Sequence, residues 1–103
     1  MNLTDLSAHA LEVADLYREA NKKNGHKTRT VEQYMSGMVG DVGDLQKLIM
    51  AKCWYRYYEA VDQKIEHELS DVLWSLLVIA STLDIDLEKV FIQTMTSLKE
   101  RIA

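Results

Sequence analysis

The stretch IEHELSDVLWSLLVIA, residues 65–80, decides the fold. At 100° per residue, its apolar side chains cover one broad face of a helix and much of the remainder. From Val72 to Ala80 only Ser75 is polar. A helix that is apolar nearly all round is buried on all sides. The stretch therefore predicts a central helix, over about residues 63–83, that other helices cover.

A narrow polar stripe interrupts this central helix. Glu68, Asp71 and Ser75 lie on it at spacings of three and four residues, which place them on one face. Buried carboxylates are costly unless they are paired or bound to a metal ion. Two explanations therefore stay open for Glu68 and Asp71: a metal site, or ion pairs with Lys or Arg from another helix.

A second carboxylate pair, Asp41 and Asp44, has the same i, i+3 spacing in an earlier helical stretch. Two such helices lying antiparallel would direct four anionic oxygen donors into one cleft. Four carboxylates repel one another unless a hard cation lies between them, and oxygen ligands favour Mg²⁺ or Mn²⁺ over Zn²⁺. The pattern thus indicates a metal site suited to phosphate chemistry. Asp41 and Asp44 flank the expected core stripe, so each could also face solvent.

The rest of the chain predicts three further helices, over about residues 4–22, 31–52 and 87–101. Thr30 and Gln33 form a capping box before the second, Asp86 caps the last, and Gly25 ends the first in a left-handed conformation. Short connections favour antiparallel neighbours, so we expect one all-α domain, 1–103, an antiparallel four-helix bundle. The expected core stripes are Leu6, Ala10, Val13, Tyr17 and Ala20 in the first helix and Met38, Val42, Leu45 and Ile49 in the second.

Composition narrows the class of protein further. The chain has 103 residues, no proline and a net charge of −4, which argues against binding of nucleic acid polymers or anionic membranes. Its one cysteine, Cys53, fits a reducing cytoplasm. The uncharged run Val72–Leu83 is too short to span a bilayer. Three short helices can hardly cover a central helix on all sides, so we expect oligomerisation, as a homodimer or homotetramer, to complete the bundle.

Two motifs resemble a known family. GDVGDLQKL at 40–48 and HELSDVLW at 67–74 are similar to the motifs of MazG-like all-α nucleoside triphosphate pyrophosphohydrolases, relatives of the dimeric dUTPases. That family carries E-x-x-E, a spacer, and E-x-x-D. The similarity continues through MAK at 50–52, DIDLEKVF at 84–91 and LKERI at 98–102. The chain departs from the family in having two aspartates in the first motif, and in having Gly40 where a further glutamate is frequent.

The resemblance implies an enzyme that cleaves a nucleotide between its α and β phosphates and releases a monophosphate and pyrophosphate. It implies Asp41, Asp44, Glu68 and Asp71 as the catalytic residues and the ligands of Mg²⁺, for which Mn²⁺ could substitute. The metal would neutralise phosphate oxygens and activate a water. The substrate would be a ribo- or deoxynucleoside triphosphate, with a house-cleaning role.

Cationic and aromatic residues are candidates for contacts with the substrate. Lys52, at a position where similar enzymes carry a lysine, Arg56 and Arg101 could bind phosphates, or could be ordinary surface charges. Lys27 and Arg29 lie in a polar loop that could close over a ligand, although solvated loop charges are the simpler explanation for them. The aromatic residues could stack on a base or belong to the core or a subunit interface. They are Trp54, Tyr55, Tyr57, Tyr58 and Trp74, of which Trp74 is the best single candidate.

Three hypotheses for function follow. The first is a Mg²⁺-dependent pyrophosphohydrolase. The second is a non-hydrolytic metal- and nucleotide-binding module of the same fold, in which the two aspartates and Gly40 have reduced turnover. The third is a structural bundle whose carboxylates pair with Lys and Arg.

Gly40 and Gly43 each disfavour a helix by roughly 1 kcal/mol relative to alanine, so we expect close approach of a ligand, of another backbone, or of a tightly packed helix there.

Overall fold

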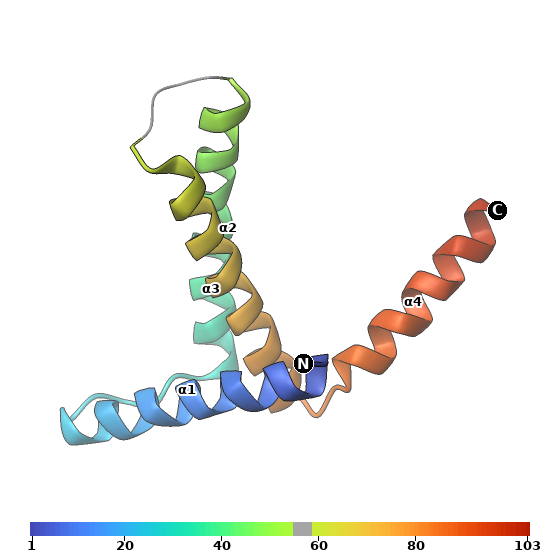
Figure 1. The fold of residues 1–103 in the computed structure, drawn as a ribbon. Coiled ribbons are helices and arrows are strands. Elements are labelled where there is room, and N and C mark those ends of the chain that lie inside the picture. The colour runs from blue at the N-terminus through green and yellow to red at the C-terminus, as the bar shows by residue number, and fades with distance from the viewer. Residues whose placement is uncertain (55–58) are drawn as a thin grey trace. The chain divides into compact units, whose positions relative to one another are not determined.

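The computed structural model describes residues 1–54 and 59–103, and the secondary structure in them is entirely helical. The helices are α1 (Leu3–Lys23), α2 (Val31–Cys53), α3 (Val61–Thr82) and α4 (Leu87–Ile102) (Figure 1). The all-α class is confirmed, and each predicted helix agrees with an observed one to within two residues at either end.

Local sequence signals explain where these helices begin. The Thr30 side chain accepts from the amide of Gln33 at 3.3 Å, and the Gln33 side chain accepts from the amide of Thr30 at 2.8 Å. Asp86 caps α4 by accepting from the amide of Lys89 at 3.2 Å. Both predicted caps are therefore confirmed.

Left-handed residues end two of the helices. Gly25 follows α1 with φ +73°, as predicted, and the amide of His26 donates to the carbonyl of Asn21 at 2.7 Å. After α3 the same arrangement uses Asp84 with φ +56°, and the amide of Ile85 donates to the carbonyl of Ala80 at 2.9 Å. Both are Schellman motifs, which satisfy the carbonyl groups at a helix end. Aspartate tolerates this conformation better than most residues other than glycine.

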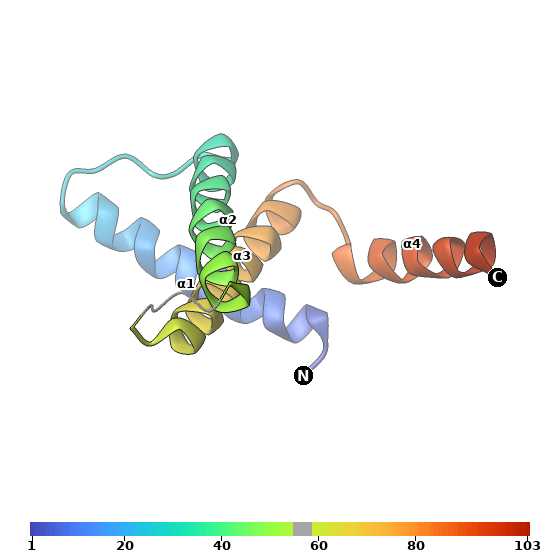
Figure 2. The same ribbon diagram turned by 90° about the horizontal axis from the view of Figure 1, so that it is seen from above.

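The chain divides into two compact units. The first contains residues 1–28 and 77–103, and the second contains residues 29–76. In the second unit, α2 and α3 lie side by side in both views (Figures 1 and 2). Tyr34 near the start of α2 contacts Trp74, whereas Lys52 near its end contacts Asp62 at the start of α3. The two helices are therefore antiparallel, as predicted.

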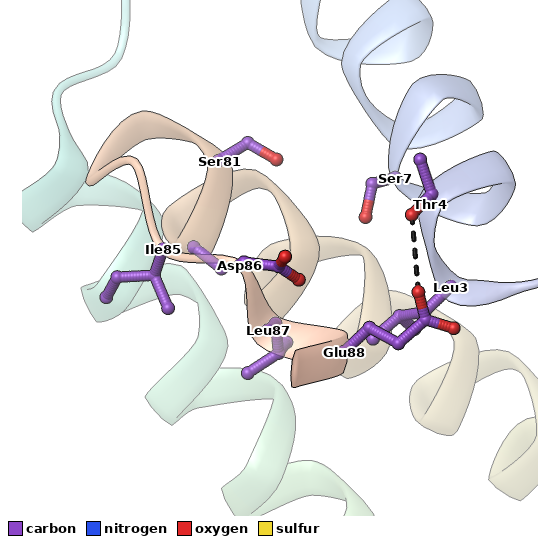
Figure 3. A pocket seen from close by; sticks show the side chains of 9 residues that line it. Leu3, Thr4, Ser7, Ser81, Ile85, Asp86, Leu87 and Glu88 are labelled. Carbon is purple, nitrogen blue, oxygen red and sulfur yellow. Dashed lines mark hydrogen bonds between the residues drawn. The ribbon is translucent and has the colours of Figure 1, made fainter. Parts of the chain in front are cut away.

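In the first unit, α1 and α4 are joined by a side-chain hydrogen bond. The hydroxyl group of Thr4 donates to a carboxylate oxygen of Glu88 at 3.4 Å (Figure 3). A hollow of about 270 Å³ lies beside this bond, and Ser7, Ser81 and Asp86 contribute to its polar lining (Figure 3). None of the predicted site residues that the structure describes lines this hollow.

The buried face of α2 differs from the predicted one. Tyr34 and Leu48 are buried, and Asp41 lies between them at helical spacing and is half-buried. Val42 and Ile49, which were expected in the core, are exposed. Met38 and Leu45, the other two residues of the predicted stripe, are half-buried, so the prediction is right for these two and wrong for Val42 and Ile49, because the periodicity of apolar residues cannot indicate a carboxylate on the inner face.

The burial of α3 also differs from the prediction. Ser75, Leu77, Val78 and Ala80 are buried, but Leu69 is 52% exposed and Leu73 and Leu76 are each 41% exposed. The expectation that this helix is buried on all sides is wrong for a single chain. In α1 the buried residues are Ala10 and Ala14, whereas Val13 and Tyr17, also expected in the core, are exposed.

In the described part of the chain, no helix combines the length and the apolar composition that crossing a bilayer requires.

Candidate metal centre

Three of the four predicted carboxylates converge in the second unit. Asp41 and Asp44 of α2 and Glu68 of α3 each offer one oxygen atom, and these three atoms lie within 4.8 Å of one another. Asp41 and Glu68 are half-buried and Asp44 is exposed. The i, i+3 spacing on α2 places its two carboxylates on one side, and the antiparallel course of α3 brings Glu68 opposite them.

Glu68 is the residue at which the electrostatic conflict is greatest. Its Oε2 atom is buried and has no hydrogen-bond partner in the described structure. Burial raises the pKa of the Glu68 carboxyl group above its ordinary value, and the nearby charges of Asp41, Asp71 and Asp44 raise it further. His67 acts weakly in the opposite direction. An anionic oxygen in this position is unfavourable unless a proton or a cation accompanies it.

Basic side chains do not provide that cation in the described part of the chain. Its ion pairs that involve Lys or Arg join Arg18 to Asp15, Lys22 to Glu19 and Lys52 to Asp62. Among residues 1–54 and 59–103, no Lys or Arg pairs with Asp41, Asp44 or Glu68. The alternative that these carboxylates are satisfied by basic partners therefore finds no support here.

The donor set fits a hard divalent cation. All three groups are carboxylates, which Mg²⁺ and Mn²⁺ prefer as ligands. The buried Oε2 atom of Glu68 accepts no hydrogen bond from any described residue, so it is available to bind a cation. The absence of a sulfur or imidazole donor from the group makes zinc a poor fit.

Asp71, the fourth predicted ligand, lies beside this cluster but is not one of its three converging residues. Its Oδ2 atom lies 3.1 Å from Nε2 of His67, one helical turn earlier on α3. The charge of Asp71 still raises the pKa of Glu68. Its role as a metal ligand stays a prediction. The side chain of His67 is exposed, and the i, i+4 spacing that joins it to Asp71 is visible in the sequence, although the sequence analysis did not select it.

Lys52 is exposed at the end of α2 and forms an ion pair with Asp62 at the start of α3. The hydrogen bond and charge of Asp62 raise the pKa of the Lys52 ammonium group. Arg101 is exposed in the last turn of α4, in the first unit. Arg56 lies outside the described residues. The role of each in binding phosphate stays a prediction.

Trp74 is half-buried and meets the ring of Tyr34 edge to face, with ring centroids 5.6 Å apart. The guanidinium group of Arg29 lies 5.8 Å from the centroid of the Tyr34 ring. Tyr34, which sequence reasoning did not select, therefore links Arg29 to Trp74. Trp54 is exposed at the C-cap of α2. The remaining aromatic candidates, Tyr55, Tyr57 and Tyr58, lie outside the described residues.

The glycines that flank the acidic pair face open space. A Cβ atom at Gly40 or Gly43 would meet no described atom within 4 Å beyond the helix itself. Tight packing against the other described residues of the second unit, one of the expected reasons for these glycines, is therefore wrong. Approach of a ligand or of a second chain remains as a reason.

Fold and site together define an all-α protein whose antiparallel helical hairpin gathers carboxylates of the kind that bind a divalent cation. The family model of the MazG nucleotide pyrophosphohydrolase domain matches residues 29–102. The chain belongs to this family of nucleotide pyrophosphohydrolases. Comparisons with curated proteins and with solved structures gave no match.

Proposed function

We propose that this protein is a Mg²⁺-dependent pyrophosphohydrolase that cleaves ribo- or deoxynucleoside triphosphates into a monophosphate and pyrophosphate, with a house-cleaning role. The observation that carries the proposal is the convergence of Asp41, Asp44 and Glu68, with the buried Oε2 atom of Glu68 left without a partner. Membership of the MazG nucleotide pyrophosphohydrolase family supplies the reaction class.

In this proposal Asp41, Asp44 and Glu68 hold Mg²⁺, or Mn²⁺ in its place, and Asp71 is the fourth ligand. A divalent cation at such a site neutralises phosphate oxygens and lowers the pKa of a water molecule. Each carboxylate has two oxygens, so one that is not used in binding the ion remains to accept a proton from the attacking water. The half-buried position of Asp41 and Glu68 limits the screening of these interactions by solvent.

Lys52 is the proposed contact for the phosphates, with Arg56 and Arg101 as further candidates. Lys52 is eleven positions after Asp41, which places it about 17 Å further along α2 and about 20° around the helix axis. It thus lies on nearly the same face as Asp41. Because Asp62 occupies its ammonium group, phosphate binding by Lys52 competes with the ion pair.

Trp74 is the proposed contact for the nucleobase. It lies one helical turn beyond Asp71 on α3, and the edge-to-face contact with Tyr34 fixes the position of its ring. Stacking on an aromatic ring stabilises any base, so this contact by itself favours nucleotides as a class over one particular base.

We propose further that the protein is a homodimer or homotetramer in the reducing cytoplasm. The exposed apolar side chains of Leu69, Leu73 and Leu76 on α3 support an oligomer, because burying them removes apolar area from water. The single, exposed Cys53 supports a reducing compartment. Light scattering coupled to size-exclusion chromatography measures the oligomer directly, and a monomer at micromolar concentration would contradict that part of the proposal.

The test of the function is the release of pyrophosphate from a panel of ribo- and deoxynucleoside triphosphates, with Mg²⁺ and with EDTA. We expect Mg²⁺-dependent pyrophosphate and the matching monophosphate from wild type, and none from Glu68→Gln. Glu100→Gln, which makes the same charge change at an exposed site on α4, is the matched control and should retain full activity.

One other outcome has a specific basis in the sequence. Asp41 and Asp44 stand where the family usually has glutamates, and Gly40 replaces a frequent glutamate. If Mg²⁺ raises the melting temperature and nucleotides bind, but no nucleotide is cleaved, the protein is a non-hydrolytic binding module of the same fold. Release of orthophosphate and a diphosphate would contradict the proposed reaction.

A further inference from the structure

The contact between His67 and Asp71 lies directly beside the acidic cluster. Nε2 of His67 is 3.1 Å from Oδ2 of Asp71, across one turn of α3. The side chain of His67 is 72% exposed and that of Asp71 is 41% exposed. The contact therefore engages one of the two carboxylate oxygens of Asp71 and leaves the other available.

Asp71 needs such a partner because it is surrounded by like charge. It lies three residues after Glu68 on the same face of α3, and its charge is one of those that act on Glu68. His67 is the basic residue that contacts it in the described ion pairs. Without that contact, repulsion from the three converging carboxylates would favour rotamers of Asp71 that point away from them.

We propose that His67 is a positioning residue for Asp71: it holds the Oδ2 atom, so that the other carboxylate oxygen of Asp71 is presented to a divalent cation bound by Asp41, Asp44 and Glu68. Residues that hold a ligand's second polar atom commonly fix its orientation and contribute about 10- to 100-fold to metal affinity. This inference depends on the metal site of the proposed function. It extends that site by a residue that does not itself contact the ion.

A pair at i, i+4 also stabilises a helix slightly, whatever its neighbours do. The test must therefore measure metal binding and not only stability or turnover. The chain offers a matched control, because His9 lies 4.0 Å from Glu12 on α1, in the first unit, and is also exposed. His9→Leu removes a histidine beside an acid at a site that the inference does not involve.

The experiment is a titration of nucleotide-free protein with Mn²⁺, in which electron paramagnetic resonance counts the unbound ion. We expect His67→Leu to weaken Mn²⁺ binding by about tenfold. His67→Gln should retain most of the Mn²⁺ affinity, because the side-chain amide of glutamine can donate to the carboxylate of Asp71 four residues later. His9→Leu should bind as wild type does.

A double variant identifies the route of the effect. If His67 acts through Asp71, then His67→Leu should weaken Mn²⁺ binding no further once Asp71→Asn is present. An unchanged affinity in His67→Leu, or the same tenfold loss in the Asp71→Asn background, would overturn the inference. Either result, together with Mn²⁺ binding by wild type, would overturn the role of His67 without contradicting the proposed function. If wild type binds no Mn²⁺, the proposed metal site fails and this inference fails with it.

Discussion

Replacing Glu68 with glutamine should make the metal-free protein more stable, although the same change removes a proposed metal ligand. The oxygens of Asp41, Asp44 and Glu68 lie within 4.8 Å of one another. Two unit charges at that distance repel by about 1 kcal/mol in water and by about 3.5 kcal/mol at an effective dielectric constant of 20. Because Asp44 is exposed, the lower value applies best. Removing the repulsion of Glu68 by Asp41 and by Asp44 should therefore raise the free energy of unfolding by about 2 kcal/mol.

The assay is urea or thermal unfolding of wild type and Glu68→Gln, in EDTA and in Mg²⁺ at low ionic strength. In EDTA we expect the variant to melt on the order of 10 °C above wild type. In Mg²⁺ the wild type should melt at the same temperature as the variant or above it, because a bound ion stabilises only the protein that binds it. Added salt should reduce the gap in EDTA, and Glu100→Gln should behave as wild type.

The pH dependence of this gap has a definite sign. The pKa of Glu68 is raised in the folded chain above its ordinary value of 4.5. Its contribution to stability is therefore fully present below about pH 4.5 and is lost as the pH rises through the folded-state pKa. In EDTA the advantage of Glu68→Gln over wild type should accordingly be small at pH 4 and grow as the solution approaches neutrality.

The reasoning would be refuted if Glu68→Gln were less stable than wild type in EDTA at neutral pH. That result would mean that the carboxylate of Glu68 has a favourable partner and that the three oxygens do not form an unsatisfied cluster. An equal response of wild type and variant to Mg²⁺ would show instead that the ion binds elsewhere.

Gly40→Ala and Gly43→Ala should each raise the free energy of unfolding by roughly 1 kcal/mol in urea titrations, because the added methyl group meets open space. If these stabler variants also lose turnover, the substrate or a second chain uses that space, whereas lower stability would contradict the geometry. Gly25→Ala should lower the free energy of unfolding by about 1 kcal/mol, because φ is +73° at this position. An unchanged free energy of unfolding would refute the left-handed cap. Asp62→Asn should free Lys52 and lower KM for the nucleotide with kcat unchanged; a higher KM would show that Asp62 assists binding.

The helices were predictable because their ends carry strong local signals. The capping box of Thr30 and Gln33, the cap at Asp86 and the left-handed Gly25 each depend on a few adjacent residues, and each is present in the structure. Asp84 was not expected to adopt a left-handed conformation. Its conformation follows from the Schellman motif that ends α3, which the residue type alone does not specify.

The face that each helix buries was harder to predict. On α2 the half-buried Asp41 occupies a position that apolar periodicity assigns to an apolar residue, so the predicted stripe wrongly included Val42 and Ile49 beside the half-buried Met38 and Leu45. The carboxylate that makes the site also disturbs the pattern used to find the core. On α3, Leu73 and Leu76 are apolar but exposed, and an apolar pattern alone does not indicate which apolar residues other elements cover.

The candidate site was predictable in part. The i, i+3 spacing places Asp41 and Asp44 on one side of α2, which the sequence indicates, whereas the position of Glu68 opposite them also depends on the register of the two helices. Two contacts were not predicted: that of His67 with Asp71, and that of Asp62 with Lys52. The first follows from helical spacing and could have been found. The second joins two helices, so it depends on their register, which the sequence does not specify.

The most direct test of the metal site is a crystal structure of the protein with Mn²⁺, in which anomalous scattering locates the ion. We expect an anomalous peak within coordination distance of carboxylate oxygens of Asp41, Asp44 and Glu68, and its loss in Glu68→Gln. A peak bound by other residues, or none beside these three carboxylates at millimolar Mn²⁺, would contradict the account.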